Sequence, residues 1–107
     1  MKTSILAGIL LLFFATNSFA WDAEVLDILQ HGNVVAVWLS PDPGPGNCSV
    51  GSPYILVADG TPESNQKFSM LLTALTTGMK ISGYPDACTT AIWGNSRPTI
   101  QRLHLKK

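Results

Sequence analysis

The segment from Thr61 to Tyr84 predicts a capped amphipathic helix that leads directly into a short strand. Thr61 suits the N-cap, Pro62 the first helical position and Glu63 the first turn, because the free N–H groups and positive dipole of a helix start favour them. Gly78 marks the helix end. Apolar residues recur with the spacing of one buried face, at Phe68, Leu71, Leu72, Leu75 and Met79. Such a face needs a cover, so the rest of the chain must supply a sheet or a partner.

Beside this apolar stripe, the helix carries Met70, Ala74 and Thr77 at roughly helical spacing. Small or unbranched side chains there would let helices of neighbouring subunits approach, so these three residues are candidates for an oligomer face. A face that is simply exposed to solvent explains the same pattern equally well.

Residues 1–20 have the order of features found in a secretory signal peptide. Lys2 precedes an apolar run from Ile5 to Ala15, and Ser18 and Ala20 are the small residues that a signal peptidase reads. The run is only about 11 residues long, whereas a membrane-spanning helix needs about 20. We therefore expect cleavage after Ala20, no membrane span, and a secreted or periplasmic protein.

The mature chain, residues 21–107, is one small domain whose core needs additional support. Cys48 and Cys88 are the only cysteines, and an exported chain meets oxidising conditions, so we expect them to form a disulfide. Closing a loop of about 40 residues stabilises the fold by roughly 4 kcal/mol in the chain-entropy description. A redox pair or a metal site is not indicated, because no C-x-x-C occurs and only His31 and His104 could add ligands.

Five strands are predicted around the helix. They are Ala23 to Gln30, Val34 to Leu39, Tyr54 to Ala58, Lys80 to Tyr84 and Thr99 to Leu105. The first could instead be a short helix with Asp22 as N-cap and Gly32 as the stop, but the turn signal His31-Gly32-Asn33 before a β-rich run favours a hairpin. The Pro- and Gly-rich segment Ser40 to Pro53 resists both helix and strand, so it is predicted to be a surface loop held by Cys48.

The resulting order is β-β-β-α-β-β. This is the order of the OB-fold, a small five-stranded barrel with a helix between its third and fourth strands. The prediction is therefore a mainly β, OB-fold-like five-stranded barrel with one helix and one disulfide. The alternative is an open meander capped by the helix.

The element order and the phrase from Leu72 to Ile81 (LTALTTGMKI) resemble the B subunits of pentameric bacterial toxins, in the subtilase-cytotoxin and pertussis-related branch. A similar segment in those subunits ends the pore-lining helix and starts the next strand. The chain is also similar to small exported bacterial proteins with one Cys between strands two and three and another after strand four. Recognisable residues extend from about Phe68 to Cys88.

This resemblance implies an OB-fold, assembly into a pentamer and glycan binding, without catalysis in the subunit itself. Sugar recognition in the toxin branch uses a serine on the first strand or in the turn before it. Here that region reads Trp21-Asp22-Ala23-Glu24, which contains no serine. No binding residue is therefore carried over from the family.

Candidate ligand-binding residues come from the aromatic side chains near element ends. A flat ring packs on the apolar face of a pyranose, and Trp93, Asn95 and Arg97 gather a ring and polar donors within five residues. Tyr84, at the end of a predicted strand, is a further candidate. The alternative for Trp93 is a ring that caps the core, because large aromatic residues are usually mostly buried. Trp38, inside an apolar strand, is expected in the core.

Enzymatic function is not indicated. His31 and His104 could be combined with Ser or Asp residues on paper, but the sequence contains no G-x-S-x-G, H-E-x-x-H or phosphate-binding loop. No cofactor or metal is expected. Once Lys2 is removed, six basic and seven acidic residues remain, so neither a nucleic acid nor any other strongly charged partner is indicated.

The sequence thus predicts an exported, non-enzymatic binding module that contacts a glycan or a protein surface, with a glycan-binding, toxin-B-like subunit in a ring as the leading version. The alternative is a monomeric periplasmic protein-binding or inhibitor module. It would use the Ser40 to Pro53 loop and the Trp93 to Arg97 segment near the disulfide as its contact surface.

Overall fold

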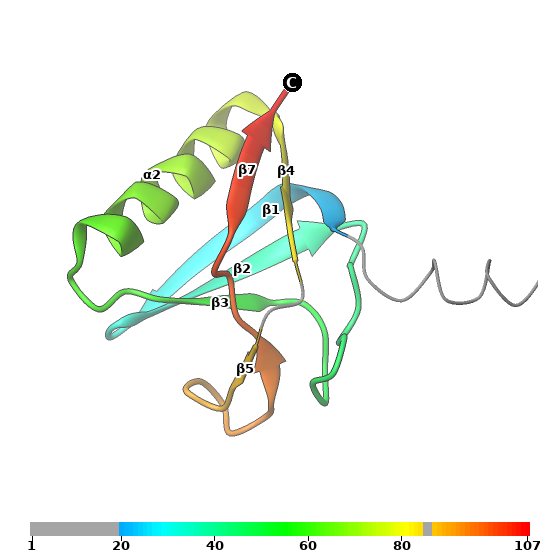
Figure 1. The fold of residues 1–107 in the computed structure, drawn as a ribbon, viewed down its shortest axis with the longest axis vertical. Coiled ribbons are helices and arrows are strands. Elements are labelled where there is room, and N and C mark those ends of the chain that lie inside the picture. The colour runs from blue at the N-terminus through cyan, green and yellow to red at the C-terminus, as the bar shows by residue number, and fades with distance from the viewer. Residues whose placement is uncertain (1–19, 85–86) are drawn as a thin grey trace, which may run out of the picture.

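The computed structural model describes residues 20–84 and 87–107 (Figure 1). The predicted signal segment, apart from Ala20, and the predicted turn residues Pro85 and Asp86 lie outside the described residues. The elements in chain order are β1 (Trp21–His31), β2 (Val34–Ser40), β3 (Tyr54–Val57), α2 (Pro62–Thr77), β4 (Lys80–Gly83), β5 (Cys88–Thr89), β6 (Arg97–Pro98) and β7 (Leu103–Lys106).

Five of these strands form one antiparallel sheet in the order β3-β2-β1-β4-β7. The mainly β class and the single helix between the third and fourth strands are confirmed for the described residues. The first element is a strand rather than a short helix, and it forms the predicted hairpin with β2.

Closure of the sheet into a barrel is not confirmed. The described edge strands β3 and β7 do not pair with each other. The chain just before β7 does approach β3, through an isolated parallel bridge between Ile55 and Thr99 and a hydrogen bond of 2.8 Å from the N–H of Ile100 to the carbonyl of Ile55. The sheet is therefore open, with one point of contact between its two ends.

The short strands β5 and β6 form a separate hairpin, at the end of the molecule opposite α2 (Figure 1). The expected disulfide is confirmed and fixes this hairpin. It joins Cys88 in β5 to Cys48 in the loop between β2 and β3, with the two Cα atoms 5.7 Å apart. Further along the same loop, the N–H groups of Ser49 and Val50 donate to the carbonyl of Ser96 at 3.0 and 3.1 Å.

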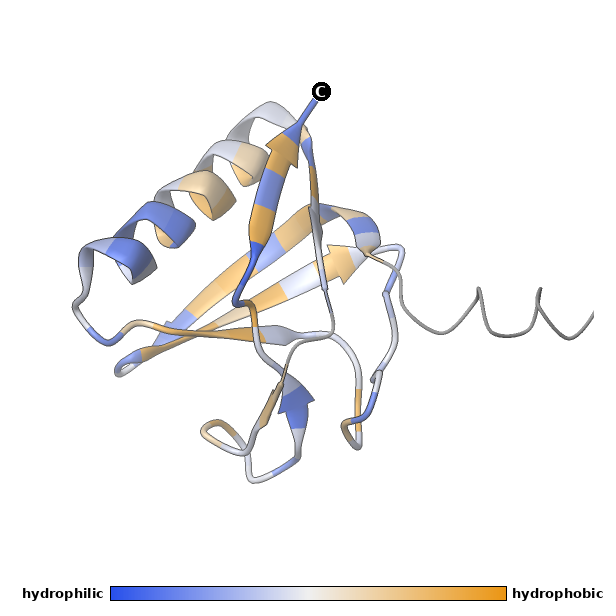
Figure 2. Ribbon diagram, in the orientation of Figure 1, coloured by the Kyte–Doolittle hydropathy of each residue, from blue (hydrophilic) through white to orange (hydrophobic). Residues whose placement is uncertain are grey.

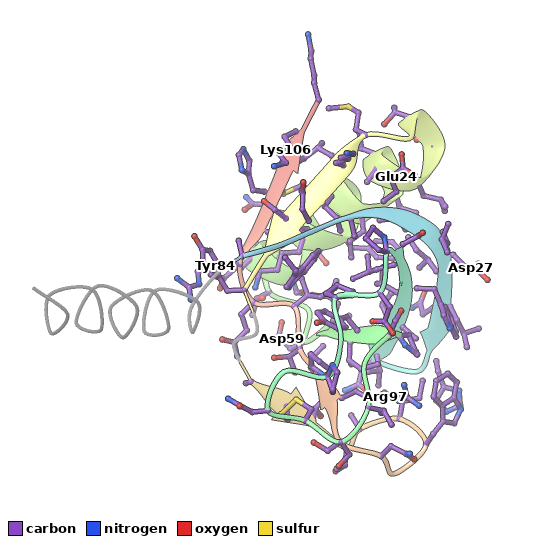
Figure 3. The ribbon with its side chains drawn as sticks, turned by 90° about the vertical axis from the view of Figure 1, so that its right-hand side faces the viewer. Glu24, Asp27, Asp59, Tyr84, Arg97 and Lys106 are labelled. Carbon is purple, nitrogen blue, oxygen red and sulfur yellow. A yellow bond between two sulfur atoms is a disulfide. The ribbon has the colours of Figure 1, made fainter. Side chains whose placement is uncertain are left out.

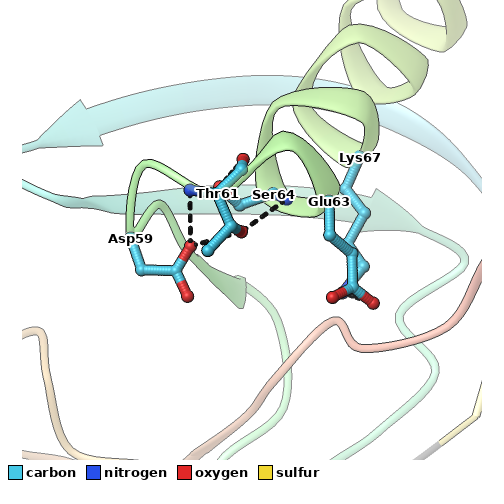
Figure 4. A network of polar contacts seen from close by, with 5 residues as sticks. All are labelled: Asp59, Thr61, Glu63, Ser64 and Lys67. Carbon is cyan, nitrogen blue, oxygen red and sulfur yellow. Dashed lines mark hydrogen bonds and ion pairs between the residues drawn. The ribbon is translucent and has the colours of Figure 1, made fainter.

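Helix α2 begins with the predicted cap (Figure 4). The hydroxyl of Thr61 accepts from the N–H of Ser64 at 3.2 Å and donates to Asp59 Oδ1 at 2.7 Å. Asp59 Oδ1 also accepts from the N–H of Thr61 at 3.1 Å. Lys67 and Glu63 form an ion pair of 3.9 Å one turn into the helix. One side chain thus satisfies a free helix donor and is itself held by a carboxylate.

The helix also ends as predicted, at Gly78. Its φ of 75° lies in the left-handed region, and its N–H donates to the carbonyl of Ala74 at 2.9 Å. Figure 2 shows that the first turns of α2 are hydrophilic and the later turns more apolar. The same figure shows alternating apolar and polar residues along β7, as expected for a strand with one side towards the core.

The helix is rotated about its axis relative to the predicted stripe. Leu71 and Ala74 are fully buried against the sheet, whereas Leu72 and Leu75 are 41% and 37% exposed. The assignment of Leu72 and Leu75 to the core was therefore wrong. The expected exposure of Ala74 on an oligomer face was wrong as well, because its small side chain lets the helix approach the sheet closely.

The remaining residues of the two predicted helix faces take intermediate positions. Phe68 packs at the margin of the core. Met70 and Met79 are half-buried, and Thr77 is exposed. Thr77 also donates its hydroxyl to the carbonyl of Thr73. The core beneath the helix contains twelve buried residues, ten from the sheet and its connections and two from the helix: Trp21, Ala23, Val25, Val35, Val37, Leu39, Tyr54, Leu56, Leu71, Ala74, Ile81 and Ile100.

Candidate binding face

Strand β2 is apolar on both sides. Val35 and Val37 point into the core beneath α2, whereas Val34 and Ala36 belong to a second buried cluster with Ile55. Successive side chains of a strand point to opposite faces, so the uninterrupted apolar run of β2 supplies two clusters at once. The sheet therefore has a second apolar face, on the side away from the helix.

Cross-strand pairing extends this second face over three strands. Ala36 lies opposite both Leu29 of β1 and Ile55 of β3, and Val34 lies opposite Val57. Opposed side chains point to the same side of a sheet. Leu29 and Val57 are 43% and 41% exposed, so this apolar surface continues outwards beyond its buried centre.

A bulge in β1 changes which residues point outwards. The pairing with β2 shifts between Val25 and Asp27, so that Leu26 is the extra residue. Val25 and Ile28 both pack in the core beneath the helix, whereas Leu26 is 60% exposed and Asp27 is also exposed. The bulge thus directs a leucine and a carboxylate away from the core.

Trp93 lies beside this face, in the turn between β5 and β6. The residue is 54% exposed, and its indole lies 6.1 Å from that of Trp38, measured between ring centroids. Trp93 is also the only non-glycine among the described residues with positive φ, at 56°. A bulky residue there is strained, and such strain is typical of ligand clamps and other functional positions. The neighbouring Ile92 is buried in the second cluster and anchors the turn.

Arg97 of β6 lies against Trp93. Its guanidinium carbon lies 5.2 Å from the Trp93 ring centroid, and one terminal N–H group donates to the carbonyl of Ser52 at 3.4 Å. Arg97 Nε is buried without a hydrogen-bond partner. No carboxylate among the described residues forms an ion pair with Arg97. We call the surface formed by Asp27, Leu29, Trp38, Val57, Trp93 and Arg97 the outer face.

The outer face brings together only some of the predicted ligand-binding residues. Trp93 and Arg97 lie in contact, and the exposed Asn95 occupies the same turn. Tyr84 is separate: its ring lies 4.3 Å beneath the guanidinium carbon of Arg102. Figure 3 shows Tyr84 at the left edge of the molecule, Arg97 in its lower part and Asp27 at the right edge.

Sequence reasoning missed several residues of the outer face. Trp38 was expected in the core, but it is half-buried at the margin of the second cluster and contacts Trp93. Leu29, Val57 and Asp27 were not singled out. The uninterrupted apolar run of β2 was the available signal, because a strand that is apolar at every position needs a cover on both sides.

Two small cavities flank the start of α2, and only one of them includes a residue of the outer face, Val57. One, of about 240 Å³, is mainly apolar and is lined by Val35, Ala58 and Phe68 among others. The other, of about 180 Å³, is polar and includes the capping residues Asp59 and Thr61. Bonds to Thr61 lower the pKa of Asp59, so this carboxyl stays charged in its capping role.

The groups that could perform chemistry are dispersed. His31 lies at the end of β1 and His104 on β7, and both are exposed. In the described ranges, no three His, Cys, Asp or Glu residues gather in a way that could hold a metal ion. Tyr54 donates its hydroxyl to the carbonyl of Gly44 at 2.8 Å, and burial, together with Asp42, raises its pKa to about 12. Tyr54 therefore remains protonated at neutral pH.

Comparisons of the chain with protein-family models, with curated proteins and with solved structures found no match. Within the part of the chain that the structure describes, no helix has the length and hydropathy needed to cross a membrane. Function is therefore inferred from the geometry of the outer face.

Proposed function

We propose that this protein is a non-enzymatic binding module that holds another protein on its outer face. The observation that carries this proposal is the grouping of exposed apolar side chains from β1, β3 and the β5–β6 turn on the side of the sheet away from the helix, beside the half-buried Trp38 of β2. Leu29, Val57 and Trp93 are each more than 40% exposed around a buried apolar centre. Contiguous apolar surface of this kind marks interaction sites.

The residue types on the outer face support a protein partner. Tryptophan and arginine are enriched among the residues that dominate binding energy at protein interfaces, usually near the centre of the contact. Trp38, Trp93 and Arg97 lie in contact with one another on the outer face, beside its aliphatic side chains. A sugar site would need more amide and carboxylate groups beside the rings than this surface offers.

We also propose that the sheet is a partly open, OB-like barrel. The element order and the parallel contact between Ile55 and Thr99 support this assignment. OB-folds bind ligands with the face of strands two and three and the adjoining loops. Trp38 on β2 and Trp93 in the connection between β4 and β7 occupy corresponding places.

Export to the periplasm or the cell exterior belongs to the same proposal. The pattern of residues 1–20 and the Cys48–Cys88 disulfide support it, because structural disulfides persist in oxidising compartments.

Glycan binding is a second candidate function, favoured by one observation. Trp93 is 54% exposed and lies in the turn between β5 and β6, with Asn95 two residues away. A toxin-B-like ring is a further step, and it would have to use Met70 and Thr77 without Ala74, which is buried. A glycan array tests the sugar, and light scattering tests the ring.

Site-specific photo-crosslinking tests the proposed function. A photoreactive residue at position 29 on the outer face, introduced into the full chain in the expressing cells, should give defined protein adducts. The matched control is position 73, which is exposed on the helix. Adducts at position 29 that disappear in Trp93→Ala support a protein-binding outer face. No adduct at 29, or equal adducts at both positions, would contradict it.

A further inference from the structure

We infer that the protein bound on the outer face is a second copy of this chain, related to the first by a two-fold axis that passes between Trp38 and Trp93. This inference rests on the proposed function and names the partner. Its starting point is the order of charges and rings on the outer face.

Four side chains form a row with opposite charges at its ends. Asp27 of β1 is paired in register with Trp38 of β2. The Trp38 ring lies 6.1 Å from the Trp93 ring, and Arg97 stacks on Trp93 at 5.2 Å. The row therefore reads acid, indole, indole, cation, and each half joins one indole to one charge, with opposite signs in the two halves.

A two-fold interface requires a surface that is complementary to itself. In such an interface residue i of one subunit contacts residue j of the other, and j contacts i. When the row is turned end to end, Asp27 meets Arg97 of the second copy, and Trp38 meets Trp93 of the second copy. Both copies then make the same two contacts, so the dimer is closed and no outer face is left free to bind a third copy.

The charged ends are available for this pairing. The Asp27 carboxylate accepts a hydrogen bond from the adjacent N–H of Ile28 at 2.9 Å through Oδ1, and no ion pair occupies it among the described residues. Arg97 is half-buried and likewise forms no ion pair with a carboxylate among the described residues. A carboxylate from the second copy would supply the missing charge to Arg97.

Apolar side chains beside the acidic end of the row would cover the ion pair in a dimer. Leu26 and Leu29 flank Asp27 along β1, and they are 60% and 43% exposed in the single chain. Their position on both sides of the acidic end would cover the ion pair in a dimer and exclude water from it. Exclusion of water strengthens the attraction between the two charges, against the cost of desolvating them.

Sedimentation velocity tests the inference, on protein purified after expression of the full chain. We expect a reversible monomer–dimer equilibrium in the range of tens of micromolar, about the strength of a small interface. Asp27→Arg and Arg97→Asp should each weaken dimerisation by about tenfold. The double variant, which exchanges the two charges, should restore dimerisation to within about threefold of the original.

Two further variants make the result interpretable. Glu63→Arg reverses an exposed charge on α2 and should leave the dimer unchanged. Leu29→Asp changes only an exposed side chain and should abolish the dimer, so the test does not depend on whether the Arg97 variant folds. Circular dichroism would confirm that each compared variant is folded.

A monomer at every concentration, or weakening without restoration in a folded double variant, would overturn the inference. The proposed function can survive that result. If the crosslinks at position 29 then contain a different protein, the outer face is a protein-binding surface with another partner. If position 29 gives no adduct and the chain is monomeric, both proposals fail.

Discussion

Gly83 of β4 lies so close to the Trp21 ring of β1 that position 83 has no room for a side chain. The two residues are opposite each other in the sheet. A Cβ atom on Gly83 would lie 2.6 Å from Cζ2 of the Trp21 indole and 2.8 Å from the carbonyl oxygen of Arg102. The indole thus occupies the space that a side chain would take, and it packs edge to face on Tyr54, with a centroid separation of 5.3 Å.

Gly83→Ala should therefore destabilise the fold by about 1 to 3 kcal/mol, because one obstacle is backbone and the other is a buried ring. Urea unfolding measures the change. The matched control is Ser82→Ala on the same strand, for which we expect less than about 1 kcal/mol. Equal effects of the two substitutions would show that the indole can move aside.

The rotation of α2 predicts different costs for adjacent leucines. Leu71→Ala removes a fully buried side chain and should destabilise the protein by about 2 to 5 kcal/mol. Leu72 is 41% exposed, so Leu72→Ala should cost less than about 1 kcal/mol. Thermal and urea unfolding of the two variants decide between the observed orientation and the predicted stripe, in which both leucines would be equally costly to replace.

Thr61→Ala should remove the helix cap and cost about 1 kcal/mol. It should also raise the pKa of Asp59 towards its ordinary value, because the Thr61 hydroxyl no longer donates to that carboxylate. Because the pKa of Asp59 is lower in the folded state, its carboxylate stabilises the fold at pH values above the usual pKa of an Asp side chain. This stabilisation is lost as the pH falls through the lowered pKa. The wild type should therefore lose more stability on acidification than the variant, and NMR titration of Asp59 provides the direct measurement.

The raised pKa of Tyr54 predicts that the fold loses stability in strong base. Its pKa is raised from 10.0 to about 12, so the folded state retains a proton that the unfolded state has lost. The contribution is fully present below pH 10 and is lost as pH rises towards 12, by about 2 to 3 kcal/mol in total. Urea unfolding between pH 8 and about 12 should show the fall. Tyr54→Phe should lack it, while being less stable at pH 8 because the carbonyl of Gly44 loses its donor.

Local sequence signals predicted the elements well, because each depends on neighbouring residues. Thr61 and Gly78 bound the helix as expected, and the apolar runs became strands. The Cys48–Cys88 disulfide followed from cysteine number and the expected compartment. Such features depend on backbone propensities and covalent chemistry, which act before the tertiary structure is formed.

Features that depend on packing were not predictable in the same way. The side of α2 that faces the sheet is set by how closely Ala74 can approach it, which periodicity does not express. The exposure of Leu29 depends on the β1 bulge and on the register with Ala36, and neither is visible in the sequence. Of the candidate site, Trp93, Asn95 and Arg97 were found because they are neighbours in the chain, whereas Asp27 and Trp38 come from other strands.

The β5–β6 hairpin lies outside the five-stranded sheet, and the Cys48–Cys88 bond and the carbonyl of Ser96 help fix its position. The core beneath α2 contains no residue from this hairpin. Under the proposed function, substitutions at positions 93 to 95 that keep the buried Ile92 in place should alter binding while most of the folding stability is preserved. Stability and binding could then evolve at different rates, and an engineer could vary these three positions on a fixed scaffold.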